Sequence, residues 1–228
     1  MAEITYLERP VYDFGAIDSL LGLTAGTARR WIDGYERRGR LYEPVVRERS
    51  TGVEVATWGE FVETEFLASY RDAGVPMIRM RPIVAGLREQ FGVRYPLATV
   101  QPYVDDARRV VYELQEEEEL EQSMRLVVEA QAGQLTFAPQ VQRFKKTVQF
   151  EETREGTIVT RLLPLGSHRK VVIDPLKRFG APVVRSVPTE VLASLVRAGE
   201  PIEWVAEQYE LELDDVLDAL EYERQQAA

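Results

Sequence analysis

Hydrophobic residues near the amino end of the chain are spaced for two short helices joined by a tight turn. The first helix is indicated by apolar residues that recur at helical spacing: Ala16, Ile17, Leu20 and Leu21. Thr24 is predicted to cap the second helix, which extends over residues 25–35. Because Trp31 and Ile32 would pack against the first helix, polar and arginine side chains are left to face outward, as in a helix-turn-helix.

Alternation of valines with polar residues then predicts a β-hairpin over residues 37–58. Two valines precede the turn sequence RERSTG, and Val53 and Val55 alternate with polar residues after it. A hairpin directly after a helix-turn-helix is typical of a wing. We therefore expect Arg47 and Arg49, which lie in its turn, to reach DNA phosphates.

Helical spacing returns further along the chain. It predicts helices over residues 58–73 and 77–91, closed by Gly74 and Gly92. A further helix is predicted over residues 135–150.

The charged segment 102–132 contains the acidic run Glu116–Glu119 and leaves two interpretations open. One is a solvated helix, or a pair of strands beside an acidic loop. The other is a dimerisation helix, or an acidic surface that docks a basic partner.

The carboxyl end combines short strands with helices. Two β-branched runs, residues 157–165 and 170–175, predict strands. Three helices with one shared core are predicted after them: residues 188–198, 201–209 and 212–222. The last two have a helix-turn-helix shape, but the final helix carries four acids: Glu212, Asp214, Asp215 and Asp218. Because such a helix would repel phosphates, we interpret it as a protein-contact element.

The predicted fold is mainly α with short β-hairpins, in three parts. A winged helix-turn-helix domain occupies residues 1–100, and a charged connecting or dimerisation segment occupies residues 101–156. A small three-helix domain with short strands occupies residues 157–228.

The net charge of −10 opposes nucleic-acid binding, but its distribution changes that conclusion. Residues 1–109 carry 15 basic and 16 acidic side chains, whereas residues 110–228 carry 13 and 22. Seven arginines gather between residues 29 and 49: Arg29, Arg30, Arg37, Arg38, Arg40, Arg47 and Arg49. A local basic surface is therefore compatible with an acidic protein.

Composition also removes several kinds of chemistry. The chain has no cysteine and one histidine, His168, which excludes disulfides and leaves too few ligands for a Cys- or His-based metal site or triad. It contains no glycine-rich phosphate-binding motif and no run of about 20 apolar residues, and the stretch MAEITYLERP lacks the basic and apolar segments expected of a signal peptide. We expect a cytoplasmic protein without membrane association that is not an enzyme and needs no metal or cofactor.

Two stretches resemble known families. The block LGLTAGTARRW, with the helices behind it, is similar to the DNA-binding domain of MerR-like regulators, especially to the amino domains of a group of bacterial antitoxins. This resemblance covers residues 12–98. The stretch VVIDPLKRFGAPVVR, with the three helices after it, resembles the small domain of unknown function found in VapB-type antitoxins. Members of that family commonly have Gly-Thr where this chain has Ser186 and Val187.

The resemblances imply an antitoxin that represses its own operator and neutralises a PIN-like ribonuclease toxin by direct binding, with the carboxyl domain used for dimerisation or toxin contact. We predict a homodimer, because one short helix buries too little surface for specific DNA affinity. The predicted DNA contacts are Thr24, Thr27, Arg29 and Arg30 at the major groove, and Arg37, Arg38, Arg40, Arg47 and Arg49 at the backbone. The alternative is a MerR-like regulator or a protein-interaction scaffold without a toxin partner.

Overall fold

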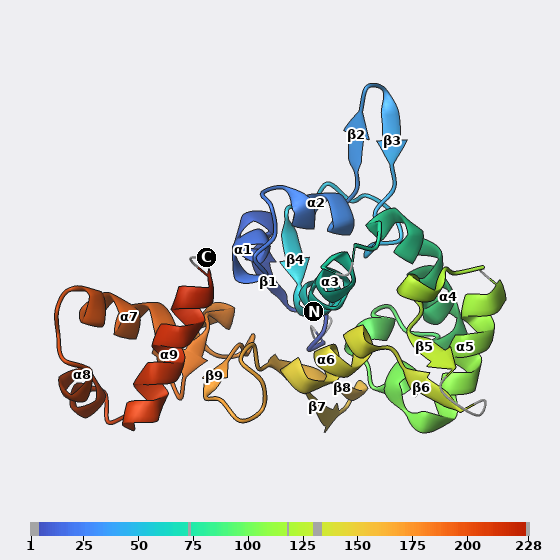
Figure 1. Ribbon diagram of the computed structural model, residues 1–228. Coiled ribbons are helices and arrows are strands. Elements are labelled where there is room, and N and C mark those ends of the chain that lie inside the picture. Colours follow the sequence, from blue (N-terminus) through green and yellow to red (C-terminus); the bar gives the residue numbers. More distant parts are fainter. Residues whose placement is uncertain (1–4, 73, 118, 130–133, 227–228) are drawn as a thin grey trace. The chain divides into compact units, whose positions relative to one another are not determined.

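The computed structural model describes residues 5–72, 74–117, 119–129 and 134–226 (Figure 1). Over these residues helices alternate with small two- and three-stranded sheets, so the predicted mainly α fold with short hairpins is confirmed. In this part of the chain, no helix is both long and apolar enough to cross a bilayer.

The chain divides by its internal contacts into two compact units. Unit 1 comprises residues 1–145 and 150–159, and unit 2 comprises residues 146–149 and 160–228. The division passes through one hairpin, formed by β7 (Val148–Thr153) and β8 (Gly156–Leu162). The boundaries predicted from the sequence at residues 100 and 156 stay a prediction.

Unit 1 begins with two helices framed by short strands. In chain order its first elements are β1 (Pro10–Asp13), α1 (Phe14–Leu20), α2 (Thr27–Ile32), β2 (Tyr35–Arg37), β3 (Arg40–Tyr42), β4 (Val55–Thr57) and α3 (Trp58–Arg71). Strand β4 pairs antiparallel with β1, and β2 pairs with β3. The α1–α2 pair is the predicted two-helix arrangement, with a shorter second helix.

The hairpin predicted over residues 37–58 is wrong in its position. The hairpin that forms is β2–β3, whose two turn residues, Arg38 and Gly39, have positive φ values of 54° and 72°, as a tight two-residue turn requires. Val45 and Val46 form no strand. They are buried, and both backbone N–H groups donate to the Trp31 carbonyl, at 2.8 and 2.9 Å. Burial beneath α2 therefore explains valines that resembled a strand in the sequence.

The helix predicted over residues 58–73 is confirmed as α3, although Ala73 lies outside the described residues. Thr57 and Glu60 start it with a reciprocal capping box. The helix predicted over residues 77–91 forms as a 3-10 turn, Met77–Met80, followed by α4 (Arg81–Phe91), which ends at Gly92 with φ 63°.

The rest of unit 1 is built from short elements and differs from the sequence prediction at residues 135–150. Its elements are α5 (Arg108–Glu117), β5 (Val127–Glu129), β6 (Leu135–Phe137) and α6 (Pro139–Thr147), with 3-10 turns at Pro96–Ala98, Gln101–Tyr103, Asp105–Ala107 and Gln122–Met124. The single helix predicted over residues 135–150 is wrong at both ends, because Leu135–Phe137 pairs with β5 and Val148 starts β7. The acidic run lies at the end of α5, and Glu118 in it is outside the described residues.

Unit 2 packs three helices on a small sheet. Its elements are β9 (Val171–Val172), β10 (Val183–Val184), β11 (Val187–Pro188), α7 (Thr189–Arg197), α8 (Ile202–Gln208) and α9 (Leu213–Gln226), with a 3-10 turn at Arg178–Gly180. The sheet has the order β11-β10-β9. One core joins them, with Val171 and Val184 from the strands, Leu192 from α7, Val205 from α8 and Val216 from α9. The three predicted carboxyl helices are confirmed.

Candidate nucleic-acid interface

Helix α2 is held in place by a carboxylate from α1. Asp18 of α1 is buried and accepts hydrogen bonds from the backbone N–H groups of Gly26, at 2.6 Å, and Ala28, at 2.7 Å. The helix starts later than predicted, since Gly26 with φ 78° is its N-cap and Thr24 is not. A side chain from the preceding helix thus supplies the cap that Thr24 was expected to supply.

Helix α2 has one buried and one exposed side. Ala28, Trp31 and Ile32 are buried, whereas Arg29 and Arg30 are exposed. The exposed pair is where the helical pattern placed it, and it is available to a ligand in solvent.

The two threonines predicted to contact DNA lie in different surroundings. Thr24 is exposed in the turn before α2. Thr27 is buried, and its hydroxyl accepts a hydrogen bond of 2.8 Å from Nη2 of Arg30. Its position suits it to orient Arg30 rather than to touch a base itself.

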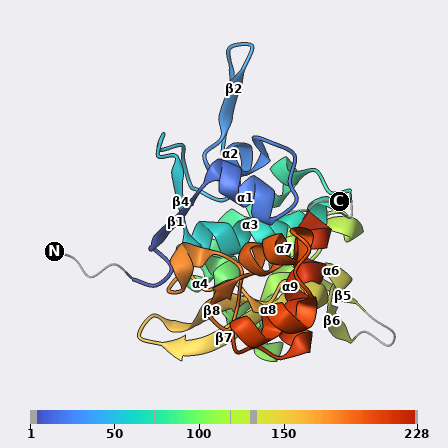
Figure 2. The same cartoon turned by 90° about the vertical axis from the view of Figure 1, so that its left-hand side faces the viewer.

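Beyond α2 the β2–β3 hairpin projects from the body of unit 1, as both ribbon views show (Figures 1 and 2). Arg37, Arg38 and Arg40 are exposed on it. At its base the rings of Tyr35 and Tyr42 stack with centroids 4.6 Å apart and planes within 3°. This ring pair stiffens an otherwise isolated two-stranded ribbon.

The arginines of α2 and the hairpin carry charge that is largely uncompensated. Arg29 lies 3.8 Å from Glu54, but both side chains are well exposed, so the pair contributes little. Among the residues described, no carboxylate lies within 4 Å of the guanidinium groups of Arg30, Arg37 or Arg38. We call Arg29, Arg30, Arg37, Arg38 and Arg40 the α2–hairpin surface.

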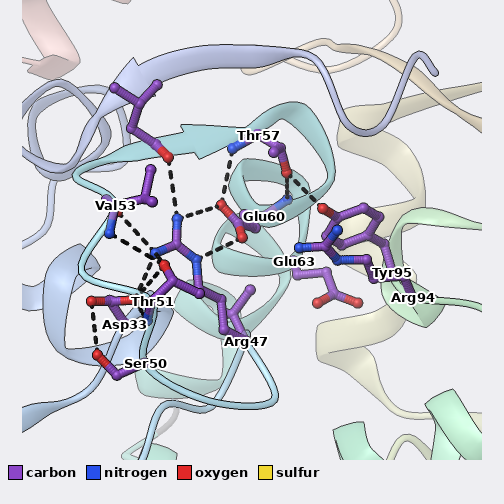
Figure 3. A network of polar contacts seen from close by, with 12 residues as sticks. Asp33, Arg47, Ser50, Thr51, Val53, Thr57, Glu60, Glu63, Arg94 and Tyr95 are labelled. Carbon is purple, nitrogen blue, oxygen red and sulfur yellow. Dashed lines mark hydrogen bonds and ion pairs between the residues drawn. The ribbon is translucent and has the colours of Figure 1, made fainter. Parts of the chain in front are cut away.

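Arg47 is the exception among the predicted contacts. It is 8% exposed, and its guanidinium is enclosed by two carboxylates: Nε lies 2.7 Å from Glu60 Oε1, and Nη1 lies 2.6 Å from Asp33 Oδ1 (Figure 3). It also donates to the Thr51 hydroxyl and to the carbonyls of Val53 and Val55. The expectation that Arg47 reaches phosphate from a wing does not fit this position, because its donors are already bound inside the protein.

Asp33 joins this network to the end of α2, where it is the C-cap residue. Burial would raise the pKa of Asp33, but the Thr51 amide, the Arg47 guanidinium and the Ser50 hydroxyl lower it to about 2. Figure 3 shows these groups gathered around the Asp33 carboxylate. The ionised carboxylate of Asp33 therefore holds the loop of residues 44–54 against the end of α2.

Glu60 joins the same network to α3. It completes the capping box with Thr57 while it binds Arg47. Arg47 thus links α2, the loop and the start of α3 into one polar core, which fixes the helix that presents Arg29 and Arg30.

Arg49, two residues away, is exposed and borders a cleft of about 370 Å³ with Arg88, Arg94 and Tyr95. Arg88 anchors the loop from α4 by donating a 2.6 Å hydrogen bond to the Val46 carbonyl. Of the two arginines predicted on the wing, only Arg49 lies at the surface.

Glu63 of α3 is fully buried near Arg88. Burial raises the pKa of its carboxyl group to about 8, although the nearby Arg88 works in the opposite direction. Oε1 accepts from the Leu97 amide at 3.1 Å, whereas Oε2 has no hydrogen-bond partner and lies 3.9 Å from Arg88 Nη2. Burial therefore favours the protonated form of this carboxyl group.

The side chains that bind metals are dispersed in this structure. Across the described ranges, no group of three or more His, Asp or Glu side chains is placed to hold a metal ion. His168 is exposed in the loop before β9.

Comparison with known proteins adds the relationship that geometry alone leaves open. The Mycobacterium tuberculosis protein Rv2308 is 36% identical over 228 residues, which cover 97% of this chain and 93% of the relative. The chain belongs to the same family as Rv2308. A second M. tuberculosis protein, named "Putative antitoxin VapB45", is 27% identical over 226 residues, covering 93% of each chain.

The fold and the carboxyl domain have relatives as well. The crystal structure of Rv2018 from M. tuberculosis covers 95% of this chain and 100% of its own, with 25% identity and a TM-score of 0.75. Residues 171–222 match the family described as "Protein of unknown function (DUF433)". These matches support the predicted relationship to antitoxins in general terms. The DUF433 match falls on the carboxyl stretch whose sequence resembles the small domain of VapB-type antitoxins.

Proposed function

We propose that this protein is the antitoxin of a type II toxin–antitoxin pair. It binds operator DNA as an autorepressor through a MerR-like winged helix-turn-helix, and it neutralises a PIN-like ribonuclease toxin by direct contact. It works by binding and not by catalysis, in the cytoplasm. The observation that carries the DNA half is the α2–hairpin surface, five exposed arginines on consecutive elements.

In this proposal α2 enters the major groove. Arg29 and Arg30 contact base edges and nearby phosphates, with Thr24 beside them, while Thr27 orients Arg30. The β2–β3 hairpin takes the role of the wing and brings Arg37, Arg38 and Arg40 to the backbone. Arg49 lies on the loop of residues 44–54 and adds a backbone contact at its edge.

Two copies of the chain act together on DNA. Helix α2 has six residues, which is too short to bury the surface that specific binding needs. A two-fold homodimer places two such helices on a palindromic operator, with half-sites about 34 Å or a multiple of that apart.

The toxin half of the proposal is supported by the similarity to VapB45 and by the DUF433 match at residues 171–222. Co-purification with the product of the neighbouring gene tests it directly. A stable complex that abolishes ribonuclease activity is expected, and a toxin that stays active and unbound would overturn it.

Gel-shift measurements on the DNA upstream of the chain's own gene test the DNA half. We expect a salt-sensitive complex that is weakened when Arg29 and Arg30 are replaced by alanine, by about 1–3 kcal/mol for each arginine that binds a base edge. The absence of a salt-sensitive complex, or equal binding by the double variant, would contradict DNA binding.

A second candidate function is a regulator or an interaction scaffold without a toxin partner. It is favoured by the strongly acidic carboxyl helices, which suit protein contact whether or not a toxin exists. Operator binding without toxin binding would select the regulator, and the loss of both would select the scaffold.

A further inference from the structure

The segment that contains α8 and most of α9 is strongly acidic. Residues 198–223 contain ten acidic side chains and not one lysine or arginine. A run of one sign at this density needs either internal neutralisation or a ligand of opposite charge.

Two of these acids are neutralised inside unit 2. Asp215 and Asp218 are 2% and 3% exposed, and they pair with Arg185 at 3.0 Å and Arg169 at 2.8 Å. Asp218 also accepts a hydrogen bond from the Lys170 amide. These two carboxylates hold α9 against the strands and do not contribute to a docking surface.

Six other acids have no such partner. All are exposed, and in the described part of the chain no basic group lies within 4 Å of them: Glu200, Glu203, Glu207, Glu210, Glu212 and Asp214. They follow one another from Glu200, just before α8, through α8 and the turn after it to the first turn of α9. Negative charge is therefore presented outward over consecutive elements.

Large apolar side chains are exposed among these acids. Trp204 on α8 is 41% exposed, and Leu213 and Leu217, one helical turn apart on α9, are 48% and 47% exposed. The core of unit 2 uses other residues of the same helices, including Val205 and Val216, which are fully buried. Trp204, Leu213 and Leu217 are not part of that core.

We propose that the α8–α9 surface binds a partner protein. We define this surface by Trp204, Leu213, Leu217 and the six exposed acids. The partner offers an apolar groove that is bordered by its own lysine and arginine side chains. The partner is the toxin of the proposed function, and the inference rests on that function. An enzyme that acts on RNA needs a basic surface for the phosphates of its substrate, and an acidic helical surface complements it. Trp204 provides the kind of large aromatic anchor that dominates binding energy at protein interfaces.

The same features disfavour nucleic acid as the occupant. Six uncompensated carboxylates repel phosphates, and the two arginines that could offset them are already paired with Asp215 and Asp218. A second copy of the chain is the other occupant to test, because the loop before β10 exposes Lys177, Arg178 and Phe179, the last at 95%.

The test compares two triple charge reversals in the full-length chain. The first is Glu203→Lys, Glu207→Lys, Glu210→Lys in the α8–α9 surface. The matched control is Glu89→Lys, Glu117→Lys, Glu129→Lys, three exposed acids of unit 1 without ion-pair partners among the described residues. Both change the net charge equally, so a difference reports position and not total charge.

Binding of each chain to the purified product of the neighbouring gene is measured by calorimetry at two salt concentrations. We expect the α8–α9 variant to weaken binding at least 100-fold and to lose most of the salt dependence, and the control to change it less than 3-fold. Trp204→Ala, which leaves every charge in place, is expected to weaken binding at least 10-fold at both salt concentrations.

The outcomes separate the inference from the proposed function. If the wild-type chain binds the toxin and both triple variants bind it with the wild-type affinity, the α8–α9 surface is not the docking site. The antitoxin function then stands. If the wild-type chain does not bind the toxin at all, the proposed function fails and this inference fails with it. Sedimentation gives the oligomeric state of each chain by itself. If the wild-type chain and the control are dimers and the α8–α9 variant is a monomer, the occupant is a second copy and the proposal is overturned.

Discussion

Two arginine-rich stretches lie side by side in the sequence and have opposite roles in the structure. The β2–β3 hairpin exposes Arg37, Arg38 and Arg40 to solvent, whereas the loop of residues 44–54 buries Arg47 between Asp33 and Glu60. The first stretch offers positive charge to a ligand. The second uses positive charge to hold the protein together, because a buried guanidinium is tolerated only when carboxylates and carbonyls satisfy it.

The comparison shows that local basic content does not identify a DNA contact by itself. What separates the two stretches is the distribution of acids in the folded chain, which brings Asp33 and Glu60 to Arg47 from 14 and 13 residues away. Substitution of Arg47 should therefore act mainly on stability, and substitutions in the hairpin mainly on DNA binding.

The largest effect is expected for Arg47→Ala. It leaves the buried carboxylates of Asp33 and Glu60 without their cation, which costs about 3–5 kcal/mol of unfolding free energy. Denaturant unfolding measures this change. Arg49→Ala is the matched control, since Arg49 is exposed, and it should stay within about 0.5 kcal/mol. Equal effects of the two substitutions would remove the distinction between the stretches.

The buried carboxyl group of Glu63 should make the stability of the protein depend on pH. The pKa of Glu63 is about 8 in the folded chain and near 4.5 when unfolded, so folding retains a proton that the unfolded chain releases. The contribution of Glu63 to the unfolding free energy should therefore be fully present below about pH 4.5. It should decrease as pH rises toward 8, by at most about 1.4 kcal/mol per pH unit. Glu63→Gln should remove this slope in unfolding experiments between pH 5 and 8. A difference from wild type that does not vary with pH would contradict the assignment.

Asp33 should show the opposite sign at lower pH. Its pKa is lowered to about 2 from 3.8, so the carboxylate contributes stability above pH 4 that is lost as pH falls toward 2. The contribution is at most about 2.5 kcal/mol. Asp33→Asn should flatten the acid limb of the stability curve, and an unchanged limb would show that the network does not depend on this charge.

The smallest effect on stability belongs to the hairpin. Replacing Arg37, Arg38 and Arg40 together by alanine should change the unfolding free energy by less than about 0.5 kcal/mol for each residue, because these side chains are exposed and hold no buried carboxylate. Thermal unfolding at matched ionic strength checks this. A large loss of stability would mean that the hairpin arginines are structural, like Arg47.

Much of the fold was predictable where apolar residues alone determine a helix. Helices α3, α7, α8 and α9 follow the spacing of their buried residues. The exposed side of α2 was predictable for the same reason, and it carries Arg29 and Arg30.

The polar network could not be read in the same way. Val45 and Val46 resemble the start of a strand, but their burial depends on Trp31, which the local pattern does not contain. One signal was present, the Thr57–Glu60 spacing of a capping box. It marks the start of α3, and it explains why no hairpin strand extends past residue 57.

The sequence predicts only part of the role of the acidic carboxyl helix. Its four acids together indicate repulsion of phosphates, yet Asp215 and Asp218 are buried partners of Arg185 and Arg169. A spacing of three residues on a helix is compatible with both lying on the inner side, but the arginines that pair with them lie about 30 or more residues earlier, beyond the reach of any helical pattern.

The salt dependence of operator binding measures whether the α2–hairpin surface contacts DNA phosphates. Affinity for the upstream DNA is measured across a range of salt for the wild-type chain and for the Arg37→Ala, Arg38→Ala, Arg40→Ala variant. The control of equal net charge is Arg109→Ala, Arg143→Ala, Arg197→Ala, three exposed arginines outside the α2–hairpin surface. We predict that the hairpin variant lowers the slope of log affinity against log salt by about 0.9 for each phosphate that it no longer neutralises, up to nearly three units, and that the control leaves the slope unchanged. A slope that is the same for the wild-type chain and the hairpin variant would contradict the assignment of the α2–hairpin surface to DNA.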